Sequence, residues 1–285
     1  MVIKIIILML QLILTAMLIQ PTVSFAQEEI PDYLQDRGSG IPMSIFGTYV
    51  RDGELLVYPF YEYYYDSNME YEPFDFGLPS MQEFRGQYQA NEFLIFLGYG
   101  ISDRLALEFE AGVITATLTK SENDTSSLES EFTESGISDV EGQIRWRWNH
   151  ENSSVPEFFN YFEYVFPTGD KHSLIGTSDW EFKLGAGVIK GFNFGTITLR
   201  LAFEYNTGEK ILEPGEYALE YLKRISNNFR FFVMIEGSQD EVSFVPEIQW
   251  FITPTILFIA ATGIGVSSKA TDFASEIGIM FSLLP

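Results

Sequence analysis

The sequence predicts an all-β fold, a transmembrane up-and-down antiparallel β-barrel of about twelve strands. Three observations predict it. Apolar and polar residues alternate along many successive segments, as expected for strands with two different faces. The joins between these segments alternate between tight turns and longer polar loops. An apolar stretch at the N-terminus has the form of an export signal.

Residues 1–26 are expected to be a cleaved signal peptide. Lys4 precedes an apolar run from Ile5 to Ile19, and Ser24-Phe25-Ala26 has the small-x-small form of a cleavage site. A retained membrane-anchoring helix is the alternative, but the run is short of the roughly 20 residues that a spanning helix needs. The mature chain is therefore expected to begin at Gln27.

Residues 27–54 show no sustained alternation, and Asp36-Arg37-Gly38-Ser39-Gly40 has the composition of a loop. Two interpretations stay open for this N-terminal segment. It is either a periplasmic tether or short extra strand, or a small plug that enters the barrel lumen.

Residues 55–285 are expected to form the barrel. Most candidate strands are near the ~9–11 residues that a tilted strand needs to cross a bilayer. An even number of strands returns both chain ends to the same side of the membrane. The expected strands are 55–65, 89–101, 104–119, 137–149, 157–168, 179–190, 195–207, 215–225, 229–238, 241–252, 255–267 and 272–284.

The joins predict the orientation in the membrane. Tight turns, which are typical of the periplasmic side, are Ser102-Asp103, Gly191–Phe194, Ser226–Asn228 and Thr253-Pro254. Longer loops, which are typical of the outside, are Asp66–Tyr88, Lys120–Gly136, Gly169–Ser178 and Gly208–Pro214. Both termini are therefore expected in the periplasm of a Gram-negative bacterium. Membrane lipid and the barrel-assembly machinery are the expected partners, and the oligomeric state stays open.

Two architectures produce strands with one apolar and one polar face. In a soluble sandwich or lipocalin-like barrel the apolar face points inward, whereas in a transmembrane barrel it meets lipid. The apolar faces here are large and rich in Phe, and Trp and Tyr residues stand near the strand ends, as in an interfacial girdle. The strands also exceed the ~5–6 residues usual in soluble domains. These features favour the transmembrane barrel.

The polar faces then line the lumen. Their charged residues are either a structural network of cross-strand ion pairs or the lining of a mildly cation-favouring path for small solutes. The candidates are Glu108, Glu110, Glu141, Arg145, Arg147, Glu163, Glu181, Lys183, Arg200, Glu204, Arg230, Glu236 and Glu247, with Glu216, Glu220, Arg224 and Glu276 on the same faces. The strand at 255–267 is apolar on both faces around Ile256–Ala261, which predicts either a greasy part of the interior or a subunit contact.

The loop Asp66–Tyr88 carries Phe74, Phe76 and Phe84. Its aromatic content predicts a lid or constriction at the outer mouth of the barrel.

Three short motifs resemble a known family. Ser135–Glu141 reads SGISDVE, Phe166–Asp170 reads FPTGD, and Tyr99–Leu105 reads YGISDRL. They resemble segments of the outer-membrane proteins named for the meta-pathway of phenol degradation, over roughly residues 90–283. The resemblance implies an outer-membrane transporter or channel linked to uptake of hydrophobic or aromatic compounds, and it transfers no ligand-binding residue. The chain departs from the usual barrel ending because it does not finish on an aromatic residue.

The physical interpretation of these motifs is structural. Pro167 and the Gly169-Asp170 pair end a strand, and Asp139, just inside a strand start, is expected to bond loop amides.

Other function classes find little support. A net charge of −23 disfavours nucleic acid, and the absence of Cys excludes disulfides and thiolate metal sites. No cofactor is expected, because there is no phosphate loop or dinucleotide fingerprint. Residues 122–129 lack the ligand spacing of a dedicated Ca²⁺ loop. No enzyme is predicted. The rivals are a sealed structural barrel, a lipid-modifying enzyme using His172 and Ser173, and a secreted soluble β-protein.

Overall fold

The computed structural model describes residues 31–168, 174–177, 179–208, 210–239 and 241–284. The predicted signal peptide, its cleavage site and the His172-Ser173 pair lie outside the described residues. No helix in the described ranges is long and apolar enough to span a membrane.

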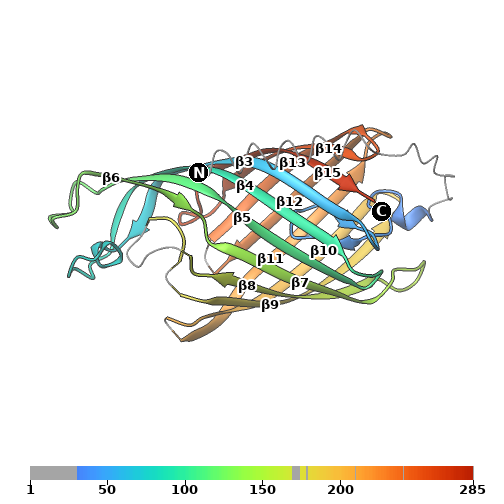
Figure 1. Cartoon of the computed structure of the whole chain (residues 1–285), viewed down its shortest axis with the longest axis horizontal. Helices are drawn as coiled ribbons and strands as arrows, with labels where there is room; N and C mark the ends of the chain where they lie inside the picture. Colours follow the sequence, from blue (N-terminus) through green and yellow to red (C-terminus); the bar gives the residue numbers. More distant parts are fainter. Residues whose placement is uncertain (1–30, 169–173, 178, 209, 240, 285) are drawn as a thin grey trace. The chain divides into compact units, whose positions relative to one another are not determined.

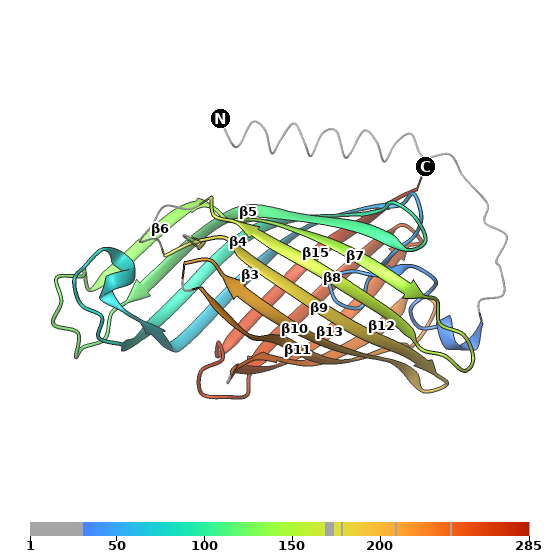
Figure 2. The ribbon, with the colours of Figure 1, turned by 90° about the horizontal axis from the view of Figure 1, so that it is seen from below.

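The described chain forms one closed antiparallel barrel (Figures 1 and 2). Neighbouring strands in sequence pair with each other, and the last strand pairs with the first, as in Phe273 opposite Tyr65. β6 and β7 both pair with β5, so they act as two halves of one wall strand. Counted in this way, the barrel wall has twelve strands. This confirms the predicted fold class. The wall consists of β3 (Leu55–Tyr71), β4 (Phe84–Gly100), β5 (Leu105–Thr119), β6 (Glu131–Ile137), β7 (Val140–Asn149), β8 (Glu157–Phe166), β9 (Glu181–Phe192), β10 (Gly195–Asn206), β11 (Ile211–Arg224), β12 (Phe229–Ser238), β13 (Glu241–Thr253), β14 (Ile256–Gly265) and β15 (Phe273–Leu283).

Two predicted loops are shorter in the structure. The β3–β4 ladder continues past an irregularity between Asp66 and Met69 and pairs Tyr71 with Phe84, so the loop covers only residues 72–83. The predicted boundary was wrong because Asp66, Ser67 and Asn68 have turn-forming composition but only bulge the strand. Likewise, β6 begins at residue 131, so the next loop covers 120–130.

The break between β6 and β7 anchors the loop that follows β8. Asp139 accepts hydrogen bonds from the backbone amides of Thr168 (2.9 Å) and Thr177. The expected bonding of Asp139 to loop amides is confirmed.

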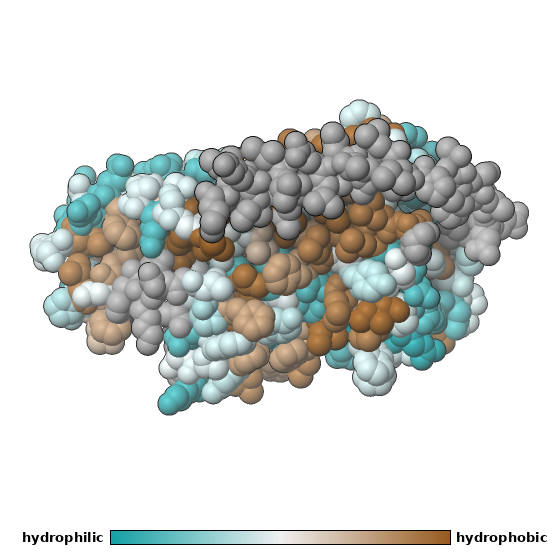
Figure 3. All heavy atoms as spheres, viewed as in Figure 1, coloured by the Kyte–Doolittle hydropathy of each residue, from teal (hydrophilic) through white to brown (hydrophobic). Residues whose placement is uncertain are grey.

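The apolar face of the wall points outward. On β10, Leu199, Leu201 and Phe203 are 49%, 68% and 59% exposed, whereas Arg200 between them is 5% exposed. Apolar side chains cover much of the visible outer wall (Figure 3). A soluble barrel would bury this face, so the described residues have the inverted arrangement of a transmembrane barrel.

Residues 31–54 occupy one end of the barrel, with Asp36, Arg37 and most of residues 40–50 buried inside it. They form a short 3-10 helix, η1 (Asp32–Leu34), and a small hairpin of β1 (Ile41–Pro42) and β2 (Tyr49–Val50), at the barrel end where β15 finishes (Figures 1 and 2). β1 pairs with β2 and neither strand joins the wall ladder. This stretch is called the inner segment below.

An apolar core joins the inner segment to the wall. Ile41 and Val50 are buried against Leu257 and Ile259 of β14. The second apolar face of this strand is therefore a greasy part of the interior, one of the two expected outcomes. Tyr58 and Phe96 belong to the same core.

Candidate functional site in the barrel lumen

A buried ion-pair group holds the inner segment. Arg37 donates hydrogen bonds to the carboxylates of Glu151 (3.1 Å) and Glu157 (3.0 Å), and all three side chains are almost fully buried. Glu157 also pairs with Arg147 (3.1 Å), and Glu151 with Lys190 (3.1 Å). Each buried carboxylate therefore has two cationic partners, which offsets its desolvation.

Backbone groups of the inner segment complete this attachment. Arg147 donates to the carbonyl oxygens of Ser39 (3.2 Å) and Gly40. Asp36 accepts a hydrogen bond from the backbone amide of Arg224 (2.8 Å). The segment is thus tied to both β7 and β11.

Tyr49 packs beneath this group. The Arg37 guanidinium lies 5.4 Å from the centroid of its ring. Burial, partly offset by the charge of Arg37, raises the pKa of the Tyr49 phenol. The phenol therefore stays neutral and adds no charge to the lumen.

The tip of the hairpin meets a second charged group. Arg200 pairs with Glu216 and Glu220 (2.5 Å each) and lies 4.7 Å from the centroid of the Phe46 ring. Gln249 donates a hydrogen bond to the Phe46 carbonyl oxygen (3.2 Å). Phe46 is therefore held between β10 and β13.

Ser44 contacts a third group on β5. Its backbone amide (2.9 Å) and its hydroxyl both donate to Glu108. Glu108 also pairs with Arg145, whose guanidinium lies over the rings of Tyr161 (5.1 Å) and Phe159 (5.8 Å). The connection between β1 and β2 is thus hydrogen-bonded to Glu108 of β5 through Ser44 and to Gln249 of β13 through Phe46.

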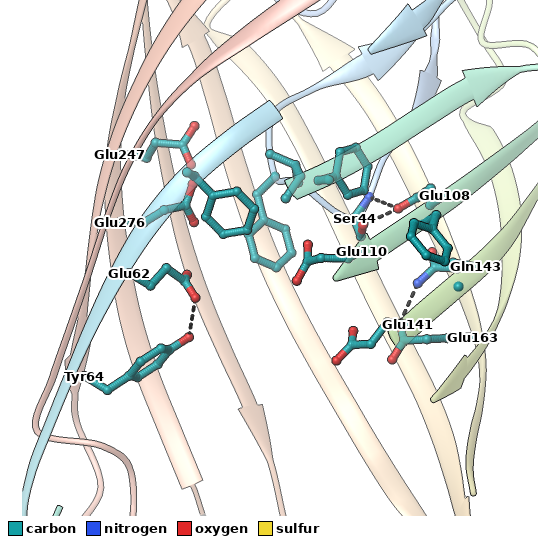
Figure 4. Close-up of a pocket in the computed structure, with 16 residues that line it drawn as sticks. Ser44, Glu62, Tyr64, Glu108, Glu110, Glu141, Gln143, Glu163, Glu247 and Glu276 are labelled. Carbon is teal, nitrogen blue, oxygen red and sulfur yellow. Dashed lines mark hydrogen bonds between the residues drawn. The ribbon is translucent and has the colours of Figure 1, made fainter. Parts of the chain in front are cut away.

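Beyond the tip lies a chamber with acidic walls (Figure 4). Two cavities of 230 and 260 Å³ share Phe46, Glu62, Tyr64, Glu247 and Glu276. Neither lining contains Lys, Arg or His. Seven glutamates line the first cavity: Glu62, Glu108, Glu110, Glu141, Glu163, Glu247 and Glu276.

The predicted lumen residues fall into two regions, the surroundings of the inner segment and the acidic chamber. Three basic candidates, Arg147, Arg200 and Arg230, contact the inner segment, and a fourth, Arg145, pairs with the Glu108 that Ser44 contacts. Six acidic candidates line the chamber: Glu108, Glu110, Glu141, Glu163 and Glu247 in one cavity and Glu236 in the other. The rest lie on β9 and β10, where Lys183 pairs with Glu163 (2.9 Å) and stands opposite Glu204, and Glu181 accepts a hydrogen bond from Asn206 (3.0 Å).

Several site residues escaped sequence reasoning. Asp36, Arg37 and Ser44 stand in a stretch without periodicity, so nothing in the pattern placed them in the lumen. Glu62 and Glu157 lie on the lumen-facing side of their strands, so alternation could have identified them. Aromatic residues on both faces of these strands hid the alternation.

The three aromatic gate candidates lie on two elements, Phe74 and Phe76 on the 3-10 helix η2 (Pro73–Phe76) and Phe84 on β4. Phe84 belongs to β4 rather than to a loop, because the β3–β4 ladder continues beyond Asp66. Phe76 and Phe84 pack against Tyr71, with ring centroids 6.2 and 5.9 Å away, whereas Phe74 is 47% exposed. A gating role for this region stays a prediction.

No described group of three or more His, Cys, Asp or Glu side chains is placed to hold a metal ion.

Comparison with known proteins places the fold. No protein-family model matches the chain, and a search of curated proteins found no match. Among solved structures, the COG4313 outer membrane channel from Pseudomonas putida F1 matches with a TM-score of 0.61 at 14% identity, over 82% of this chain and 97% of that one. The chain has the fold of an outer-membrane β-barrel.

Two further matches have lower scores. The translocator domain of the autotransporter NalP from Neisseria meningitidis gives a TM-score of 0.46 at 11% identity, over 81% of this chain and 89% of that one. The toluene transporter TbuX from Ralstonia pickettii gives 0.40 at 8% identity, over 82% and 89% of the two chains. These neighbours are named as a translocator domain and a transporter.

Proposed function

We propose that this chain is an outer-membrane channel through which small solutes pass, and that the inner segment closes its lumen. The observation that carries the proposal is the occupant of the lumen. The segment that fills it has no ladder to the wall and is held there by ion pairs, hydrogen bonds and one apolar core. The inner segment can therefore leave the lumen without breaking the hydrogen bonds between the wall strands.

The proposed location is the outer membrane of a Gram-negative bacterium. The signal peptide is cleaved between Ala26 and Gln27, the long loops face outward, and both termini are periplasmic. The inner segment then closes the barrel from the periplasmic end, since it follows directly from the mature N-terminus.

The proposed relatives are the outer-membrane proteins named for the meta-pathway of phenol degradation. The SGISDVE and FPTGD motifs support this assignment, since the first supplies Asp139 and the second supplies the Thr168 amide that Asp139 binds. Membership would make the solute a small, hydrophobic or aromatic molecule.

Planar bilayers test the channel. The purified mature protein is expected to give discrete conductance steps in KCl, because the lumen lining is polar. A barrel that gives no steps under any applied voltage would refute the proposal.

A sealed structural barrel is the second candidate. Ion pairs that join different strands, such as Lys183 with Glu163, favour it because they brace the lumen from within. It predicts neither conductance steps nor solute flux into liposomes, which separates it from the channel.

A further inference from the structure

The acidic chamber holds more carboxyl groups than the basic side chains of the described residues pair with. Of the seven glutamates in the first cavity, Glu108 pairs with Arg145 and Glu163 pairs with Lys183. No described basic side chain lies within 4.0 Å of the other five carboxylates: Glu62, Glu110, Glu141, Glu247 and Glu276.

We propose that this chamber binds an organic monocation, an ammonium group carried on a small apolar or aromatic body. The inference rests on the proposed channel function, because it names the class of solute that the channel takes.

Two deeply buried side chains lack the partner that such a ligand would supply. Glu247 is 4% exposed and receives a hydrogen bond only from the neutral amide of Gln249 (2.6 Å) among the bonds found. Gln143 is 5% exposed, and its Oε1 has no hydrogen-bond donor, whereas its Nε2 donates to Glu163 (2.5 Å). A buried carboxylate without a cation and a buried carbonyl without a donor are both costly, and an ammonium group is at once cation and donor.

Tyrosine hydroxyl groups, which carry no positive charge, are hydrogen-bonded to two of the other carboxyl groups. Tyr58 donates to Glu276, and Tyr64 donates to Glu62 (2.8 Å). Figure 4 shows Glu62, Glu247 and Glu276 on one side of the cavity, Glu141 on the other, and Glu110 reaching between them. The charge is therefore spread around the wall and is not converged as a metal centre requires.

Aromatic walls favour a ligand with an organic body. Phe46, Phe60, Phe96 and Tyr64 line the same cavity. Aromatic faces attract ammonium groups through their quadrupoles, and they also bury apolar surface. A hydrated inorganic cation gains the first contribution only by losing its water, whereas an organic ammonium ion uses both.

Titration calorimetry with three ligands that share one ring tests the inference. Benzylammonium, benzyl alcohol and benzoate differ in charge and are titrated into the detergent-solubilised mature protein. Benzylammonium is expected to bind, and the neutral and anionic ligands are expected to give no measurable heat. Glu110→Gln and Glu247→Gln should each weaken benzylammonium binding about tenfold, as expected for loss of one charge-assisted hydrogen bond.

Controls separate binding from folding and from transport. Glu83→Gln changes an exposed acid in the 72–83 loop and should leave the affinity unchanged. Glu110→Gln is the safer variant for folding, since Glu110 is only partly buried; heat-modifiability on gels checks both variants. Equal affinity for benzyl alcohol, no benzylammonium binding, or affinity unaffected by both variants would overturn the inference. Conductance without benzylammonium binding rejects the site and keeps the channel, whereas binding without conductance rejects the channel alone.

Discussion

Replacing Arg37 with Ala should open the barrel. The substitution removes the cation that bridges Glu151 and Glu157, both of which are buried in the wall. Truncating one partner of a buried ion pair costs about 3–5 kcal/mol. Lys190 and Arg147 remain beside the two carboxylates, so the lower end of that range applies.

The magnitude follows from that cost. If the loss falls on the closed state, about 3 kcal/mol shifts the equilibrium between closed and open barrels on the order of a hundredfold. Single-channel recording in planar bilayers measures this directly as open probability. The heat-modifiable band on gels should stay as in the parent protein, because the wall ladder is untouched.

Arg51→Ala is the matched control. Arg51 belongs to the same segment and also pairs with a glutamate, Glu54 (3.0 Å), but its side chain is 47% exposed. Solvent screens the half-exposed Arg51, and the buried Glu54 keeps the hydrogen bond from the Ser282 hydroxyl, so the open probability should change much less than for Arg37→Ala. Equal open probability for the parent, Arg37→Ala and Arg51→Ala would refute the closing role of the Arg37 group.

Three other changes probe the docking of the inner segment and the outer loop. Ile259→Ala removes a fully buried side chain beneath the segment, should weaken its docking by about 2–5 kcal/mol, and should speed proteolysis within residues 31–54; an unchanged digestion rate would speak against the apolar core. Gly191→Ala places a Cβ against the backbone of Tyr33 and should raise the same digestion rate; equal rates would mean that η1 does not depend on this close approach. Asp139→Ala removes the hydrogen bonds to Thr168 and Thr177 and should raise protease cleavage in the outer loop on intact cells, with conductance unchanged; a loop as resistant as in the parent would contradict its anchoring role.

Alternation was enough to predict the barrel wall. On β10 it placed Arg200 inside and Leu199 and Leu201 outside, as the structure has them. The method works because side chains on a strand point to opposite faces in strict order, and lipid and lumen have opposite chemistry. Strand ends were less predictable, because the polar residues at Asp66–Asn68 form a bulge as readily as a turn.

The closed lumen could not be predicted in the same way. The inner segment has no period, and its contacts join residues more than a hundred positions apart, as in Arg37 with Glu151 and Glu157. The arginines of β7 and β10 were foreseen as lumen residues, but not that they hold a segment of the same chain. Alternation predicted the glutamates of the acidic chamber as lumen residues. Only the structure shows that they lie apart from the arginines around the inner segment.

A chemical cross-link between the inner segment and the wall tests directly whether the inner segment closes the lumen. The chain has no Cys, so a Ser44→Cys/Glu108→Cys variant carries two thiols at a place where the parent side chains are hydrogen-bonded. Bridging them with a short thiol-specific cross-linker fixes the hairpin to β5, and the two single variants serve as controls. If the inner segment closes the lumen, conductance steps appear before cross-linking and none appear afterwards. Conductance that persists at full cross-linking would contradict this closing role, because solutes would then pass while the segment is in place.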